Sequence, residues 1–408
     1  MSRQKVDSEM ITSIAASKLS GALPALDGSA LTGITGMIKA ASDPVVTTNP
    51  AGGVGSIYLN TADGEMFCCT DATTDENVWK NIGAGSGAVA PFFYPGATSI
   101  YASGTTDDVS GSRTNIEKFA IATDGNMADV GTLAAGSIHT TGGGSKSDTH
   151  AYVIGGHTST VGTGHPWYGD GIQKYSFAAG VQNGSTVGLT STYEGAYRMG
   201  YSDGTYAYTT GRYTVLSGVE YNTNTIERFN TSTEAAIEDH GDLSLAISLG
   251  GFHSSVTHGY TVGGEGTPGG STWFGHIDKF AFASNITALS HGTLAPGRGL
   301  SSSYNTETTG YVAGGRHNPN PTAVSGIDKF LFASNTTTTD CGNLSTNRAY
   351  MGGGGSGEDF GYTIGGSGNS NGSGSTDVME KQQFSNDATF QGIGNLTVAQ
   401  IMVTANQI

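Results

Sequence analysis

The stretch "HGYTVGGEG", residues 258–266, is an apolar run rich in β-branched residues that ends on two glycines. It returns as "HAYVIGGHT" from His150, as "TGYVAGGRH" from Thr309 and as "FGYTIGGSG" from Phe360. Such a run predicts a β-strand. Because glycine has no Cβ, each glycine pair can turn with positive φ and approach a neighbouring backbone closely. The chain therefore repeats the sequence of one strand and its turn several times.

The repeat continues through the C-terminal part of the chain, and the tyrosine of each strand marks it at steps of 51, 56, 52, 51 and 51 residues. A second signature follows each marker, as in "IDKF" at Ile277 and Ile327. A third, x-Gly-x-Leu, closes each unit, as in "HGTL" ending at Leu294. The six markers are Tyr101, Tyr152, Tyr208, Tyr260, Tyr311 and Tyr362. Three signatures in constant order define six successive units.

Each unit is expected to be covered on both faces. In "HIDKFAF", Ile277 and Phe280 lie three positions apart, so on a strand they point to opposite faces. A sheet sandwiched between two neighbouring sheets meets this requirement. A period of about 50 residues with three or four short strands per unit is typical of a β-propeller blade. The sequence predicts an all-β protein in which residues 88–408 form a six-bladed β-propeller.

The repeat also carries a family resemblance. "YVIGG" followed by an "IDKF"-like strand resembles the kelch repeat of β-propellers. The unit "GYVAGG…GIDKFLFASNTTTTDCGNL", residues 310–344, is similar to kelch-like repeats in virion proteins of marine and cyanobacterial phages. The resemblance spans residues 92–408 and implies a structural protein of a tailed phage. The last strand lacks the usual kelch tryptophan, so the partners of eukaryotic kelch proteins are not carried over.

Composition and charge exclude several classes of protein. The chain has 65 glycines in 408 residues and only 13% charged residues, which favours strands and turns over helices. The net charge of −16 argues against a nucleic-acid partner, because phosphate binding needs clustered Lys and Arg. The start "MSRQKVDSEM" has no apolar signal-peptide core, and no apolar run reaches about eighteen residues. We expect neither secretion by a signal peptide nor a membrane span.

The first ninety residues differ from the repeats. Residues 1–42 are predicted to be a fibre-like docking and oligomerisation segment, since the Leu and Ile side chains of "LSGALPALDGSALTGITG", residues 19–36, can be buried only against other chains. A flexible linker is the alternative. Residues 43–87 are predicted to be a small β module with a hairpin through Asp63-Gly64, a third strand and a hinge. Both parts resemble N-terminal regions of phage tail-fibre proteins, which implies a homotrimer.

Two segments compete to complete the first blade. "PFFYPGATSIYASG" from Pro91 matches the opening strand pair of the later units. "AQIMVTANQI", after Leu396, also has the pattern of an opening strand. One of the two is expected to pair across the seam of the ring, where it removes exposed strand edges.

The sequence offers no constellation for catalysis. It contains no H-x-H, H-E-x-x-H or D-x-D-x-D-G metal string and no sialidase-type Asp box, so no catalytic residue, metal or cofactor is expected. Cys341 occupies the repeat position held by Val130 and His240 in other units, which indicates a packing role. Cys68 and Cys69 are sequence neighbours and cannot easily meet disulfide geometry.

The charges within "IDKF" suggest contacts between blades. Neighbouring strand positions face opposite blades, so Asp278 is predicted to meet the lysine of one neighbour and Lys279 the acid of the other. A ring of such pairs would have a gap at Gln173. Solvated charges at the sheet edges are the alternative.

The loops that follow the glycine pairs vary while the scaffold repeats. Two of the three tryptophans lie there, each followed by another aromatic residue. An aromatic ring beside polar groups suits sugar binding, whereas the alternative is that these aromatics pin their own loops or meet a protein. The predicted ligand-binding residues are Trp167, Tyr168, His165, Asp170, Tyr213, Trp273, Phe274, Arg316 and His317.

Together these features predict a phage virion structural protein without enzymatic activity, a tail fibre or receptor-binding protein whose propeller loops contact a host-surface glycan or protein. Two alternatives stay open: a capsid or tail decoration protein that makes only virion contacts, and a glycan-degrading enzyme, which requires clustered carboxylates in one pocket. The expected partners are further copies of the chain, other virion proteins and the host surface. The expected location is the virion, after synthesis in the bacterial cytoplasm.

Overall fold

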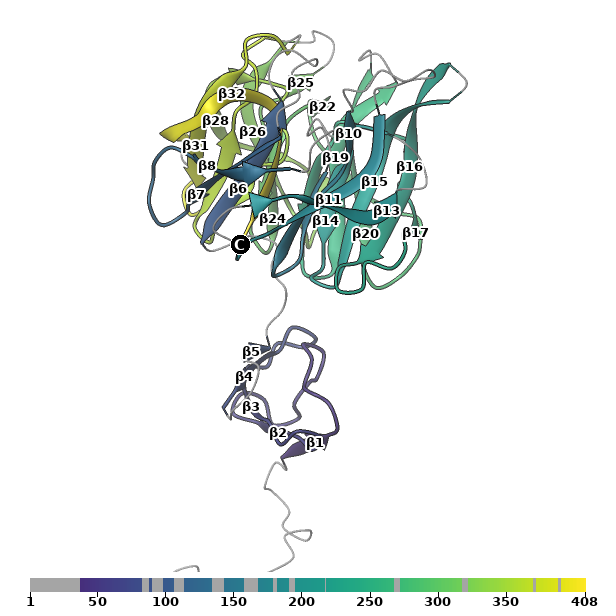
Figure 1. Ribbon diagram of the computed structural model, residues 1–408, viewed down its shortest axis with the longest axis vertical. Coiled ribbons are helices and arrows are strands. Elements are labelled where there is room, and N and C mark those ends of the chain that lie inside the picture. The colour runs from purple at the N-terminus through teal and green to yellow at the C-terminus, as the bar shows by residue number, and fades with distance from the viewer. Residues whose placement is uncertain are drawn as a thin grey trace, which may run out of the picture. The chain divides into compact units, whose positions relative to one another are not determined.

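The protein is all-β. A computed structural model describes residues 37–82, 88–89, 98–105, 114–133, 143–157, 168–178, 182–190, 195–216, 218–267, 272–317, 322–369, 372–387 and 390–408. These residues form strands, turns and bends, and none of them belongs to a helix that could cross a membrane. The chain divides into two compact units, residues 1–91 and 92–408, each described here by itself (Figure 1).

The first unit contains a five-stranded sheet in the order β1-β2-β3-β4-β5. Its strands are β1 (Ile38–Ala40), β2 (Ile57–Asn60), β3 (Met66–Asp71), β4 (Val78–Asn81) and β5 (Ala88–Val89). β2 and β3 form an antiparallel hairpin around Asp63-Gly64 and β3 pairs with β4, which confirms the predicted hairpin and third strand. Gly64 has a φ of 82°, a conformation that favours glycine. A small core holds the unit together: Tyr58, Phe67, Cys69 and Trp79.

The second unit repeats one antiparallel strand order (Figure 1). The strands that carry the marker tyrosines are β6 (Ser99–Thr105), β10 (His150–His157), β15 (Tyr206–Leu216), β19 (His258–Thr267), β24 (Thr309–Ala313) and β30 (Phe360–Ile364). Each pairs with the strand of the second signature: β7 (Asn115–Ala120), β11 (Tyr168–Ser176), β16 (Val219–Asn230), β20 (Thr272–Ala281), β26 (Val324–Leu331) and β31 (Thr376–Gln383).

Two further strands flank each central pair. The opening strands are β9 (Gly143–Lys146), β14 (Met199–Ser202), β18 (Gly251–Ser254), β23 (Ser302–Asn305) and β29 (Gly355–Ser356). The closing strands are β8 (Ala128–Thr132), β13 (Ser185–Thr190), β17 (Glu238–Asp242), β21 (Leu289–Thr293), β28 (Thr339–Arg348) and β32 (Gln391–Gln407). Four short strands complete the unit: β12 (Gln182–Asn183), β22 (Arg298–Gly299), β25 (Arg316–His317) and β27 (Thr336–Thr337).

The last strand serves two sheets. The first part of β32 pairs with β31 of its own repeat, and its second part pairs antiparallel with β6 of the first repeat, from Ile401↔Thr105 to Gln407↔Ile100. Of the two segments that could open the first sheet, the C-terminal one therefore takes that place. Residues 91–97, which begin the other candidate, lie outside the described residues.

The opening strands contact one another in chain order. β14 contacts β9 and β18, and β23 contacts β18 and β29. β32, which opens the first sheet, contacts both β29 and β9. The series of contacts thus returns from the last repeat to the first.

The glycine pairs have the predicted backbone. Gly263 and Gly264 have φ values of 65° and 113°, and the pairs of the fifth and sixth repeats have similar values. A Cβ on Gly263 would lie 2.1 Å from the carbonyl oxygen of Arg298, in the segment that leads into the next sheet. Glycine is required there both for its φ and for this close approach.

The core lies between neighbouring sheets. Ile277 packs in a cluster with Tyr260 and Phe330, while Phe280 packs with Tyr208 of the preceding sheet. These contacts confirm that both faces of the sheet are covered. The marker tyrosines also cross between sheets: Tyr260 stacks on Phe332 with ring centroids 4.4 Å apart and donates a hydrogen bond to its carbonyl oxygen.

The predicted pairing of "IDKF" charges is wrong. Asp278 is buried and accepts hydrogen bonds from the backbone N–H and hydroxyl of Ser244, in the segment that leads into its own sheet, while Lys279 lies over the ring of Tyr260. The acid is bonded to the segment that enters its own sheet, and no lysine among the described residues forms an ion pair with it.

Lysines at this position do cross to the next sheet, but to a different acid. Lys174 pairs with Glu234 at 2.7 Å, and Lys329 pairs with Asp387. Lys381 of the last repeat pairs at 2.8 Å with Asp124, which is in the first repeat. In each case the acid lies seven residues after the second-signature position that Asp278 holds.

Candidate functional site

The segments before the opening strands lie beside the loops that follow the glycine pairs. Isolated bridges join Ala196 to Tyr213 and Ser248 to Glu265. Arg298–Gly299 pairs in the same way with Arg316–His317. One end of the sheets therefore brings these entry segments together with the described residues that follow the marker tyrosines. We call it the loop end.

An apolar collar of five large residues occupies the loop end. Their φ values lie between 51° and 60°, although none is glycine. The collar residues are Tyr197, Leu249, Leu300, Tyr350 and Met402. This conformation costs a non-glycine residue roughly 1–2 kcal/mol. Their side chains must therefore contribute contacts that a glycine at the same position would lack.

A central pocket opens within the collar. Four collar residues line it, together with the buried Arg198 and Ser301 and with Met351 and Val403. It holds about 40 Å³ of space, enough for a few water molecules. The Ser301 hydroxyl is buried, with no hydrogen-bond partner among the described residues. The pocket thus combines mainly apolar walls with a polar group at its lining.

The structure describes only part of the predicted ligand-binding set. Trp167 and His165 lie outside the described residues, and Tyr168 and Asp170 are described only as backbone of β11. Tyr213 lies at the loop end, where its ring centroid is 5.9 Å from that of the collar residue Tyr197.

Trp273 is buried. Its side chain is 4% exposed and packs against Gly299, where a Cβ would lie 2.6 Å from the indole ring. Phe274 is half-buried against the core and covers Gly266 in the same way. In this conformation the Trp273 ring is a support within the loop end and has no open face on which a sugar could stack.

Arg316 lies between two aromatic rings. Its guanidinium carbon is 5.6 Å from the Trp273 ring centroid and 5.8 Å from that of Tyr350. Nη1 of Arg316 donates a 2.9 Å hydrogen bond to the Tyr350 hydroxyl. The structure therefore brings Trp273 and Arg316 together, with His317 following Arg316 in β25. Sequence reasoning missed Tyr350, which precedes an opening strand and follows no glycine pair.

Arg316 differs from the other described arginines because no acidic residue in the described part of the chain pairs with it. The structure describes six arginines, and five of them form ion pairs: Arg198 and Arg212 with Glu227, Arg228 with Glu238, Arg298 with Asp328, and Arg348 with Glu380. Arg316 has no acidic oxygen within 4.0 Å among the described residues. The neighbouring stretches outside that description, 268–271 and 318–321, contain no Asp or Glu.

A second, polar pocket of about 430 Å³ lies at the opposite end of the strands, between the second and third repeats. It is lined by Asp148, His150, Lys174 and Glu234 together with Ser and Thr hydroxyls. Burial lowers the pKa of His150. Lys174 already bonds both carboxylate oxygens of Glu234 at 2.7 Å, so its charge is matched within the protein.

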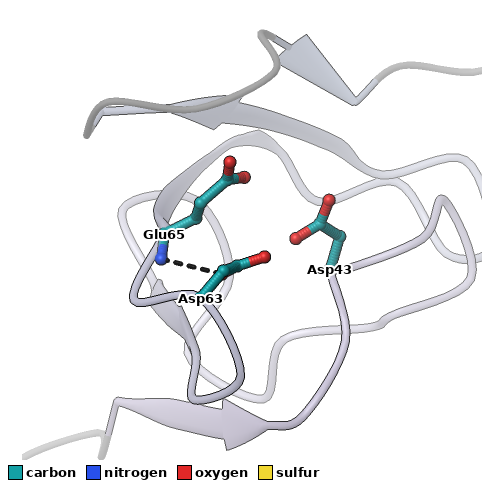
Figure 2. A group of neighbouring side chains, drawn as sticks. All are labelled: Asp43, Asp63 and Glu65. Carbon is teal, nitrogen blue, oxygen red and sulfur yellow. Dashed lines mark hydrogen bonds between the residues drawn. The ribbon is translucent and has the colours of Figure 1, made fainter.

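The first unit holds a small acidic cluster. Figure 2 shows the carboxylates of Asp43, Asp63 and Glu65, whose oxygens lie within 4.8 Å of one another. The Asn60 side chain bridges Asp43 and Asp63, and the Glu65 backbone N–H donates to Asp63. These hydrogen bonds give the cluster a structural role, which is to stabilise the turn between β2 and β3.

Cys341 has the environment expected of a packing residue. It is buried among Tyr304, Tyr311 and Leu344, and no disulfide is formed by it. Burial raises the pKa of its thiol to about 12, which disfavours the reactive thiolate.

Comparison with known proteins gives a likeness of fold. No family model matches the chain, and no curated protein matches it in sequence. A solved structure titled "Structure of YjhT" matches 66% of this chain and 87% of its own, with a TM-score of 0.53 and 11% sequence identity. At this identity the likeness concerns the fold alone.

Proposed function

We propose that residues 92–408 form a six-bladed, kelch-like β-propeller. Three observations support this. The opening strands contact one another in a series that returns to its start, and β32 completes the first sheet. The Lys381–Asp124 pair joins the last repeat to the first in the same way as Lys174 and Glu234 join the second repeat to the third. Sheets that shield one another on both sides need such a ring, because a single blade buries too little apolar surface to be stable.

We further propose that the protein is a phage virion structural protein that binds the host surface through the loop end. The apolar collar carries this proposal. Four of its five large side chains line one opening in a backbone conformation that favours glycine, and use of the opening for contact would explain why this conformation is kept. The sequence that follows the glycine pairs does not repeat, and a recognition surface built from it can vary without disturbing the scaffold.

The first unit is proposed to assemble the particle. It exposes large apolar side chains around a core of four residues, including Val45 at 56% and Val54 at 65% exposure. Such a surface favours association with further copies or with other virion proteins. The preceding residues 1–36, with their apolar-x-Gly steps, lie outside the described residues.

The test uses antibodies against the purified full chain. They should label intact particles in electron microscopy, and the purified chain should bind host cells and compete with particle adsorption. Labelling without binding or competition would favour a decoration protein that makes only virion contacts. Release of sugars from envelope polysaccharide by the purified chain would support the enzyme alternative instead, and unlabelled particles would refute a virion protein.

A further inference from the structure

We propose that Arg316, held between Trp273 and Tyr350, is an anion-binding subsite of the loop end. The ligand group it takes is an oxyanion, a carboxylate or a phosphate, carried by a surface polysaccharide. This inference rests on the proposed host-binding function and names the chemistry that the host ligand would supply.

The guanidinium is fixed in place before any ligand arrives. Two side chains hold it: the Trp273 ring at 5.6 Å, and Tyr350 through its ring at 5.8 Å and through the hydrogen bond that Nη1 donates to its hydroxyl. The backbone of Arg316 is anchored as well, since it pairs with Gly299 in the β22–β25 ladder. A guanidinium that is fixed in this way loses little conformational freedom on binding, and its planar fork matches an oxyanion.

Its hydrogen-bonding capacity is largely unused. The bond to Tyr350 is the one hydrogen bond that the guanidinium makes to described residues, and its Nε is buried without a partner. An arginine that only tied the loop end together would be expected to pair with an acid, as the five other described arginines do. A partly exposed cation without an acidic partner among the described residues, in a chain of net charge −16, is suited to an external anion.

The subsite borders the central pocket. Ser301 and Met351 line the pocket. Gly315, next to Arg316, packs against Ser301, and Tyr350 directly precedes Met351. A ligand that places its oxyanion at Arg316 would extend its uncharged part over the collar. A charged group next to apolar walls matches an acidic sugar, whose ring has an apolar face.

The experiment measures binding of three probes to the full-length protein by calorimetry: an oligogalacturonate for carboxylates, inorganic phosphate, and a neutral maltooligosaccharide of the same length as the oligogalacturonate. The wild type should prefer an anionic probe over the neutral one, and the preference should weaken at higher salt. Arg316→Gln should weaken anionic binding about 10- to 100-fold, the loss expected for a charge-assisted pair. Arg316→Lys should recover part of it, because it keeps the charge without the fork.

Arg228→Gln is the matched control. Arg228 is also partly exposed and lies over a tyrosine ring, but it is paired with Glu238 near the other end of the strands. It should leave probe binding unchanged. Thermal unfolding midpoints of all variants separate a binding defect from loss of fold.

Several outcomes would overturn the inference: no anionic probe binds the wild type, the neutral probe binds equally well, or Arg316→Gln keeps the anionic preference. Tighter binding of an acidic peptide than of any saccharide would refute the polysaccharide assignment. The two proposals fail separately. If antibodies do not label particles but Arg316 still governs anion binding, the subsite stands and the virion role falls. If antibodies label the particles but Arg316→Gln leaves host adsorption unaltered, the virion role stands and the subsite falls.

Discussion

Gly263→Ala tests whether neighbouring sheets pack as closely as the structure indicates. The new methyl group would meet the carbonyl oxygen of Arg298 at 2.1 Å, so the backbone of the next sheet must shift. The φ of 65° adds strain of roughly 1–2 kcal/mol for a non-glycine residue. Overpacking against rigid backbone adds about 1–3 kcal/mol. We expect a total loss of about 2–5 kcal/mol, read as a lower urea midpoint for unfolding of the second unit.

Two other glycines separate the causes. Gly218 has a φ of 81° but open space around it, so Gly218→Ala should show the strain alone, about 1 kcal/mol. Gly326 has neither a positive φ nor a neighbour within 4 Å, and Gly326→Ala should be neutral or slightly stabilising. If Gly263→Ala cost no more than Gly218→Ala, the close approach between sheets would be refuted.

Three further predictions follow from buried or paired charges. Glu380→Gln should destabilise the second unit by about 3–5 kcal/mol, measured by urea unfolding, because it leaves the buried Arg348 without its acid. A double-mutant cycle of Lys381→Met and Asp124→Asn should give a coupling of about 0.2–1 kcal/mol in thermal unfolding, whereas zero coupling would argue against contact across the seam. Burial lowers the pKa of His253 to about 3, so the unfolded chain binds more protons below its ordinary value of about 6.5, and stability should fall as the pH drops from there toward 3. His253→Phe should flatten this slope by up to about 1.4 kcal/mol per pH unit, and an unchanged slope would show that other groups cause it.

The repeat made the core predictable. Residues such as Ile277 and Phe280 have to point to opposite faces of a strand, and that geometry alone requires a sheet on each side. The glycine pairs were predictable for the same reason, since only glycine tolerates both the φ of Gly263 and its approach to Arg298. Periodic residues perform the same task in every unit, so a pattern reveals them.

The charge pairs were not predictable because none of the three signatures marks their partners. Asp278 bonds to Ser244, whereas Asp328, at the same repeat position, pairs with Arg298. The partner comes from the irregular segment that enters the sheet. Lys174 does cross to its neighbour, but its acid Glu234 lies in a turn, outside the second signature on which the prediction relied.

The candidate site escaped prediction in part for a related reason. Reading the loops after the glycine pairs found Trp273 and Arg316 but left open whether the tryptophan binds a ligand or pins its own loop, and its burial favours the second role. Leu300 and Tyr350 lie in the segments that precede the opening strands β23 and β29, where no aromatic pair or turn motif marks them. Their one sequence signal is a large residue a few positions after the x-Gly-x-Leu ending, in a place where the backbone favours glycine.

The arginines show where function departs from the scaffold. A buried arginine lowers the free energy of this fold only when an acid accompanies it, and Arg298 and Arg348 each have one, in Asp328 and Glu380. Arg316 is partly exposed, so it needs no such partner for stability, and its rings and hydrogen bond merely orient it. Under the proposed function, removing it should therefore cost binding more than stability. A residue whose loss changes recognition while the six sheets stay intact is the kind of position at which a recognition surface can change.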